Sequence, residues 1–89
     1  AWTTTTRLVT CPRFVIDQVR ATRGGERRLP VGDMRVWIVL AGRGLLDTRG
    51  LPEPIRFKTG QTLVIPAEPD ETVLSVEADC LWLQVTVPR

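Results

Sequence analysis

Short apolar runs alternate with turn-forming residues about every 8–12 residues along most of this chain. The runs are rich in Val, Ile, Leu, Thr and Trp, and no window of helical length keeps an apolar period of 3.6 residues between the breakers. This pattern predicts an all-β domain of short antiparallel strands. The predicted strands cover residues 7–10, 13–21, 27–31, 35–41, 44–47, 55–58, 62–65, 72–77 and 80–87.

Glycines mark two of the predicted turns. Gly24-Gly25 and Gly42-Arg43-Gly44 can each supply the positive φ angles that a tight turn needs, so we expect a hairpin at both places. Before the first predicted strand lies a run of threonines, which is typical of a frayed terminus. We therefore interpret residues 1–6 as the remnant of a linker and residues 7–89 as one folded module.

Two predicted strands are apolar on both faces. Residues 36–41 are apolar throughout, and in the last strand Trp82 lies on one face while Leu81 and Leu83 lie on the other. An antiparallel strand with one face in water should instead alternate between apolar and polar residues. We therefore expect the second face to be covered by the end of a barrel, by a neighbouring domain or by a second copy of the chain.

Composition narrows the chemistry that the chain can perform. Its 89 residues form a single domain, and they include no histidine, no tyrosine and only two cysteines. The absence of histidine excludes Ser-His and Cys-His triads, imidazole acid–base catalysis and most zinc sites. Cys11 and Cys80 have neither metal-binding nor framework spacing, so we predict reduced thiols in a cytoplasmic protein, with a single bridge as the alternative.

The charge of the chain is small and mixed. Its formal net charge is +2, and only the stretch from Arg20 to Arg28, which also contains Arg23 and Arg27, is locally basic. That stretch could hold a phosphate, but it has no interleaved aromatic residue, so we favour a solvated turn and predict no nucleic-acid partner. No apolar run approaches 18 residues, so we predict no membrane partner. A loop of acids is interpreted as solvated rather than calcium-binding: Glu68, Asp70 and Glu71.

Four segments, in order, resemble the C-terminal domain of type I mannose-6-phosphate isomerases. They are residues 10–17, 36–44, 57–67 and 84–88. Gly60 and Pro66 have the spacing that opens the second cupin signature, and Arg35 and Gly42 have the interval that ends the first. The resemblance implies a single cupin-like β-sandwich or jelly roll.

The metal-binding positions of the cupin signatures are not kept. Arg35 stands where the first signature has a glutamate, and Ala67 and Glu68 follow Pro66 where the second expects glycine and then histidine. A cation at a ligand position repels a divalent metal, so we predict no metal, no cofactor and no catalytic residue in this chain. In the isomerases that it resembles, zinc and the proton-transfer residues belong to the preceding catalytic domain. The resemblance thus implies a non-catalytic C-terminal domain, packed against that domain, of an enzyme that interconverts mannose 6-phosphate and fructose 6-phosphate.

A few residues are candidates for binding. Arg35 could hold an anion inside a vestigial cavity, although we favour an exposed position at the start of its strand because arginine is rarely buried without a partner. Trp37 and Trp82 could form a sugar-stacking platform, although core or interface positions are commoner for tryptophan. Together with Val39, these tryptophans are also candidates for a homodimer interface. The alternative functions are a metal-free interaction or sugar-phosphate-sensing module, or an engineered scaffold.

Overall fold

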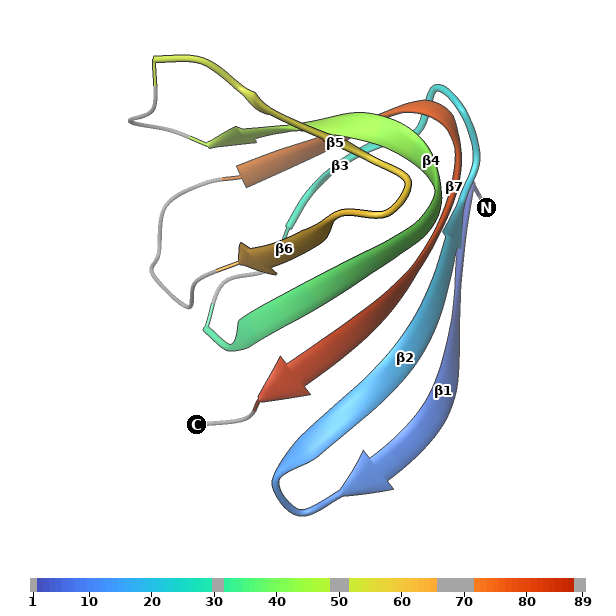
Figure 1. The fold of residues 1–89 in the computed structure, drawn as a ribbon, viewed down its shortest axis with the longest axis vertical. Helices are drawn as coiled ribbons and strands as arrows, with labels where there is room; N and C mark the ends of the chain where they lie inside the picture. Colours follow the sequence, from blue (N-terminus) through green and yellow to red (C-terminus); the bar gives the residue numbers. More distant parts are fainter. Residues whose placement is uncertain (1, 30–31, 49–51, 66–71, 88–89) are drawn as a thin grey trace.

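The structure, a computed structural model, describes residues 2–29, 32–48, 52–65 and 72–87. These residues form seven β-strands and no helix, so the predicted all-β fold class is confirmed (Figure 1). Within the described ranges there is accordingly no helix that could cross a membrane. The strands are β1 (Thr3–Cys11), β2 (Phe14–Ala21), β3 (Glu26–Arg28), β4 (Met34–Thr48), β5 (Ile55–Lys58), β6 (Thr62–Ile65) and β7 (Thr72–Val87).

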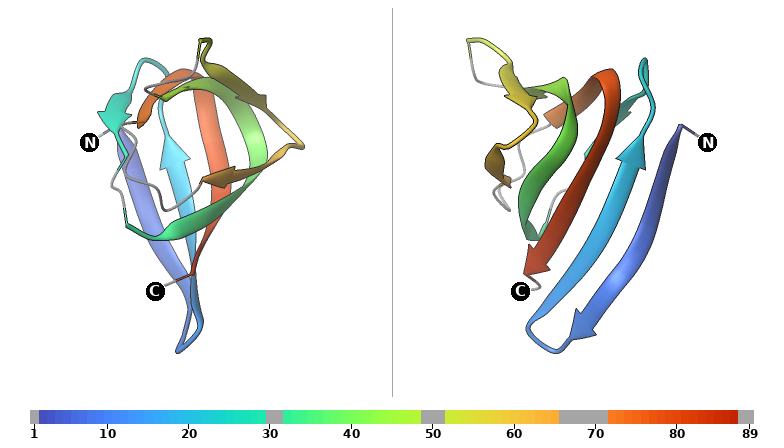
Figure 2. Two further views of the ribbon diagram at one scale, coloured as in Figure 1. Left: turned by 90° about the vertical axis from the view of Figure 1, so that its left-hand side faces the viewer. Right: turned by 45° about the vertical axis from the view of Figure 1, so that its right-hand side comes forward.

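The two longest strands, β4 and β7, pair with each other antiparallel and take part in both halves of the fold. The second half of β7 pairs with β2 and the first half of β4 pairs with β6. The first half of β7 pairs with β3, and the second half of β4 pairs with β5. One curved surface is therefore β1-β2-β7-β4-β6 and the other is β3-β7-β4-β5. Both long strands curve strongly, so that the two surfaces face one another (Figures 1 and 2).

The expected hairpin at Gly42-Arg43-Gly44 is wrong, because β4 runs through all three residues. The pairing of β4 with β7 shifts register between Val39 and Gly44, which is the signature of β-bulges. Gly42 has a φ of 94°, and a Cβ atom at this position would collide with the backbone of Asp79 and Cys80. The glycines thus allow β4 to bend across β7 and do not reverse the chain. The predicted break in the last strand, at residues 78–79, is also wrong, because β7 runs without interruption from Thr72 to Val87.

The expected hairpin at Gly24-Gly25 is wrong as well. Gly24 does have the expected positive φ, of 85°. However, β2 and β3 do not pair with each other, since β2 pairs with β1 and β7 and β3 pairs with β7. This turn instead carries the chain from one curved surface to the other.

The threonine run belongs to the sheet. β1 begins at Thr3, and residues 3–6 pair with residues 18–21 of β2. Threonine is β-branched and suits an edge strand that has one edge in solvent. The expectation that this run is frayed is therefore wrong for residues 3–6, while its origin as part of a linker stays a prediction.

Three aromatic rings form the centre of the core. The rings of Trp37 and Trp82 are stacked with centroids 4.4 Å apart, and Phe57 packs edge-on against both, at 6.0 and 6.4 Å. Trp37, Val39 and Trp82 are at most 2% exposed. These three side chains are thus core residues, and the expectation that they form a homodimer interface is wrong because no partner can reach them in this fold.

Candidate functional site

A row of side chains crosses the inner face of the first curved surface. The strand register places Arg7 opposite Asp17, Asp17 opposite Gln84, Gln84 opposite Trp37, and Trp37 opposite Leu63. Residues directly opposite one another lie on the same face of a sheet. Since Trp37 is in the core, the whole row faces the interior, and it brings three polar side chains to the inner face.

Each polar group in this row has a partner. The Nε atom of Arg7 donates a hydrogen bond of 2.5 Å to Oδ1 of Asp17, whose side chain is 8% exposed while that of Arg7 is 56% exposed. The Nε1 atom of Trp37 donates to Oε1 of Gln84 at 2.9 Å. A buried carboxylate is costly unless it is paired, so Arg7 is what allows Asp17 to face inward.

Arg35 lies in the next row of the same face, opposite Thr86 and Ile65. It is 9% exposed, so the favoured expectation of a solvent-exposed arginine is wrong. The alternation of β4 accounts for this, because Arg35 has the same parity as the core residues Trp37 and Val39. Arg35 does take part in an interaction, so it is not a buried charge without a partner.

The inner face does not assemble a metal centre from the described residues. Among them, no three histidine, cysteine or carboxylate side chains come together. The space between the curved surfaces is occupied by the rings of Trp37, Phe57 and Trp82, so the tryptophans present no open platform to a sugar. The acidic loop of Glu68, Asp70 and Glu71 lies outside the described residues.

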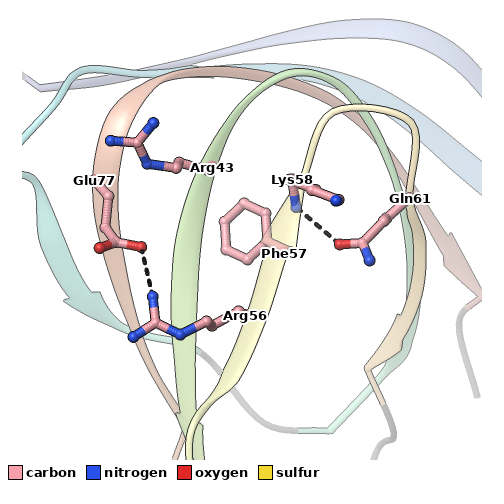
Figure 3. A pocket seen from close by; sticks show the side chains of 6 residues that line it. All are labelled: Arg43, Arg56, Phe57, Lys58, Gln61 and Glu77. Carbon is pink, nitrogen blue, oxygen red and sulfur yellow. Dashed lines mark hydrogen bonds and ion pairs between the residues drawn. The ribbon is translucent and has the colours of Figure 1, made fainter.

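A concavity lies on the surface where β5 meets the bend of β4 and β7. It is a pocket of about 280 Å³, which we call the basic pocket (Figure 3). Its lining residues are Arg43, Arg56, Phe57, Lys58, Gln61 and Glu77. An Nη1 atom of Arg56 lies 3.6 Å from Oε1 of Glu77, and the backbone N–H of Lys58 donates to Oε1 of Gln61 at 2.8 Å.

None of the polar residues of the inner row or of the basic pocket is among the binding candidates that the sequence indicates. Asp17 has the same parity as the core residues Val19 and Ala21, and this signal could have identified it as inward-facing. The correctly predicted strand 55–58 already placed Arg56 and Lys58 on one face. Local sequence pattern does not give the register between strands, and this register decides which residues of other strands lie beside these side chains.

Neither cysteine forms a disulfide in this structure, and the reduced state of the two thiols stays a prediction. Cys80 is 5% exposed, and its Sγ atom lies 3.0 Å from the carbonyl oxygen of Ala78 and 3.3 Å from that of Arg43. Burial raises the pKa of the Cys80 thiol above its ordinary value of 9.0. A hydrogen bond from the backbone of Arg43 to the sulfur lowers this pKa, and the charge of Asp79 raises it. The thiol is therefore a packed, protonated group near neutral pH.

We expect the free energy of unfolding to fall as the pH rises above 9.0, and to fall more steeply in the wild type than in the Cys80→Ala variant. The native state holds the Cys80 proton more tightly than the unfolded state does, so stability is lost as the pH rises toward the native pKa. Urea unfolding between pH 8 and pH 10.5 measures the difference. Parallel pH profiles for the two proteins would contradict the raised pKa.

Comparisons with known proteins identify the fold. No protein-family model matches the chain, and no match was found among curated proteins. Solved structures do match over nearly the whole chain. A Rhizobium leguminosarum protein of unknown function has a TM-score of 0.85 at 24% identity, over 100% of this chain and 84% of its own. A cupin superfamily protein from Desulfitobacterium hafniense has a TM-score of 0.83 at 15% identity, over 98% and 78%.

A third similar structure is a Ralstonia eutropha protein provisionally assigned as a mannose-6-phosphate isomerase. Its TM-score is 0.82 at 15% identity, over 98% of this chain and 85% of its own. At these identities the likeness establishes the fold and leaves the activity open. The strand order, the two long bent strands and the structural neighbours agree: this chain has the cupin fold.

Proposed function

We propose that this chain is a metal-free cupin module that performs no reaction by itself and serves as the C-terminal β domain of a type I mannose-6-phosphate isomerase. The observation that carries the proposal is the filled interior: Trp37, Phe57 and Trp82 pack together in the core, and Arg35 faces inward at the position of a signature carboxylate. A guanidinium there disfavours a divalent cation. The sequence resemblance and the similar structure that is provisionally assigned to this activity support the assignment.

The outer face of the first curved surface supports a packing role. One row of it, traced by the register, consists of Val9, Ile16, Val85, Val36 and Val64. Val64 is 64% exposed, and the neighbouring β4 residues Ile38 and Leu40 are 38% and 45% exposed. A contiguous apolar surface of this kind, part exposed and part half-buried, favours an interaction site. We propose that the preceding catalytic domain covers this outer face, which is exposed to solvent when the module is alone.

The test supplies the purified chain with zinc and mannose 6-phosphate. We expect no isomerisation above background and no zinc retained after dialysis. Turnover that copurifies with the chain would overturn the proposal. Light scattering then tests whether a second copy of the chain covers the outer face. That would be the conclusion if the wild type is a dimer that dissociates in the Ile38→Lys variant. The control is Arg13→Lys in the exposed β1–β2 turn, which should leave such a dimer intact.

A second candidate, a sugar-phosphate-sensing module, is favoured by one observation. Arg35, Gln84 and the Arg7–Asp17 pair bring charge and hydrogen-bonding groups to the inner face. An amide titration with mannose 6-phosphate separates the two functions, with the indole Nε1–H of Trp37 as a reporter inside the fold. A shift of that signal together with the Arg35 amide would favour sensing, and no shift at these two groups supports the packing module.

A further inference from the structure

Three cationic side chains lie on one face of the β4–β5 ladder. Arg43 is directly opposite Lys58 in the register, and Arg56 precedes Lys58 by two residues, so all three share a face. Side chains directly opposite each other have Cβ atoms about 4.5–5.5 Å apart, and like charges in that arrangement are destabilising. The pairing of β4 with β5 therefore brings three cationic residues to the lining of one pocket, with the Arg43 and Lys58 side chains on opposite sides of Phe57 (Figure 3).

The described residues compensate only part of this charge. Of the lining residues that the structure describes, Glu77 is the only carboxylate, and its ion pair is with Arg56 (Figure 3). Among the described residues, the side chains of Arg43 and Lys58 make neither an ion pair nor a hydrogen bond. The described lining residues thus carry two more positive than negative charges.

Hydrogen bonds fix the backbone of the pocket. The turn after β5 is closed by the backbone N–H of Gln61, which donates to the carbonyl of Lys58 at 3.2 Å. Three bonds fasten that turn to β4. The N–H of Gly60 donates to the carbonyl of Val39 at 2.8 Å and the N–H of Val39 donates to the carbonyl of Gln61 at 2.9 Å. The third runs from Oγ1 of Thr59 to the carbonyl of Gly42 at 3.3 Å. The bend of β4 and the end of β5 are therefore held in one arrangement, which lowers the ordering cost of binding a ligand between them.

We propose that the basic pocket binds a phosphate monoester. The phosphate group carries a charge of about −1.5 to −2 at neutral pH, which matches the uncompensated charge of the pocket. The guanidinium group of an arginine can donate two parallel hydrogen bonds to the phosphate oxygens, and a lysine adds a single positive charge. The Gln61 amide keeps its N–H donors for the ligand, because its Oε1 already accepts the Lys58 N–H.

This proposal does not rest on the proposed function. The basic pocket is lined by different residues from the inner row of Arg7, Asp17, Gln84 and Trp37, and it needs neither zinc nor isomerase activity. A phosphate monoester that shifts the amides of Lys58 and Gln61 reports on the pocket. One that shifts the indole signal of Trp37 reports on the inner face.

The experiment is an amide titration with inorganic phosphate and with methyl phosphate at pH 7.5, against sodium chloride at matched ionic strength. We expect saturable shifts at Arg43, Lys58 and Gln61 with both phosphates and none with chloride. Removing one exposed cation by Arg43→Gln or Lys58→Gln should weaken binding by about fivefold. The control Arg20→Gln removes the same charge from β2, outside the pocket, and should leave the affinity within about twofold of the wild type.

The Glu77→Gln variant is expected to raise the affinity for phosphate, whereas the loss of a cation lowers it. It removes the carboxylate that lines the described part of the pocket and releases Arg56, so both phosphates should bind more tightly than to the wild type. The proposal is overturned if chloride shifts the same amides equally, if Arg20→Gln weakens binding as much as Lys58→Gln does, or if Glu77→Gln weakens it. Binding of inorganic phosphate without methyl phosphate would overturn the assignment to a monoester.

Discussion

Replacing Trp82 with alanine is expected to lower the free energy of unfolding by about 3–5 kcal/mol. The side chain is 2% exposed, its ring stacks on Trp37 at 4.4 Å and it packs edge-on against Phe57. Truncation loses this burial and leaves a cavity between the two curved surfaces. Since a small domain is stable by only about 5–15 kcal/mol, the variant should be close to unfolding at 25 °C. Urea denaturation followed by circular dichroism measures the loss.

Two further variants make this expectation specific to the core. Leu40 is on the outer face and 45% exposed, so Leu40→Ala should cost less than about 1 kcal/mol. The loss of stability from Trp82→Phe should lie between the losses from Leu40→Ala and Trp82→Ala. This variant keeps an aromatic ring, and it removes the indole Nε1, a buried donor with no partner among the described residues. If Leu40→Ala is as damaging as Trp82→Ala, the assignment of inner and outer faces is wrong.

Local pattern was sufficient for the short strands of the fold. The predicted ranges 55–58 and 62–65 are the observed bounds of β5 and β6, and the strand predicted at 13–21 starts one residue before β2. In these segments apolar β-branched residues stand between turn-forming residues, so strand formation depends on the nearest neighbours alone.

The bend of the long strands could not be predicted in the same way. A Gly-x-Gly sequence permits a hairpin and a bulge equally well, because both need backbone that side chains would obstruct. What decides between them is the position of Asp79 and Cys80, which lie far along the chain from Gly42 yet beside it in the fold. For the same reason, the burial of Arg35 and the pairing of Arg7 with Asp17 cannot be predicted from local sequence, because both depend on contacts between strands that are distant in the chain.

The apolar strands show how far parity can be used. The sequence correctly indicated that residues 36–41 are apolar on both faces, but alternation does not show which face points inward. Trp37, Val39 and Trp82 are candidates for a partner interface on the sequence alone, and the structure places them in the core. The exposed set is the other parity, represented by Ile38 and Leu40. The packing surface of the proposed function therefore consists of residues that the interface prediction left out.

The second large effect is expected from Gly42→Ala, and Gly24→Ala is its matched control. Both glycines have positive φ angles, of 94° and 85°, so alanine pays the left-handed backbone cost of about 1–2 kcal/mol at either position. A Cβ atom at Gly24 would meet nothing within 4 Å. A Cβ atom at Gly42 would collide with the carbonyl oxygen of Asp79 and with Cys80, where β4 bends across β7.

The difference between the two variants isolates the cost of that close approach. The backbone of β7 cannot move away from Gly42 without disturbing its pairing with β4, so we expect Gly42→Ala to cost about 3 kcal/mol or more, and Gly24→Ala about 1 kcal/mol. Urea midpoints of the two variants, compared at equal m-values, give the comparison directly. Equal losses would mean that residue 42 needs only a left-handed backbone, as a hairpin turn would, and that the strand does not bend through this glycine against β7.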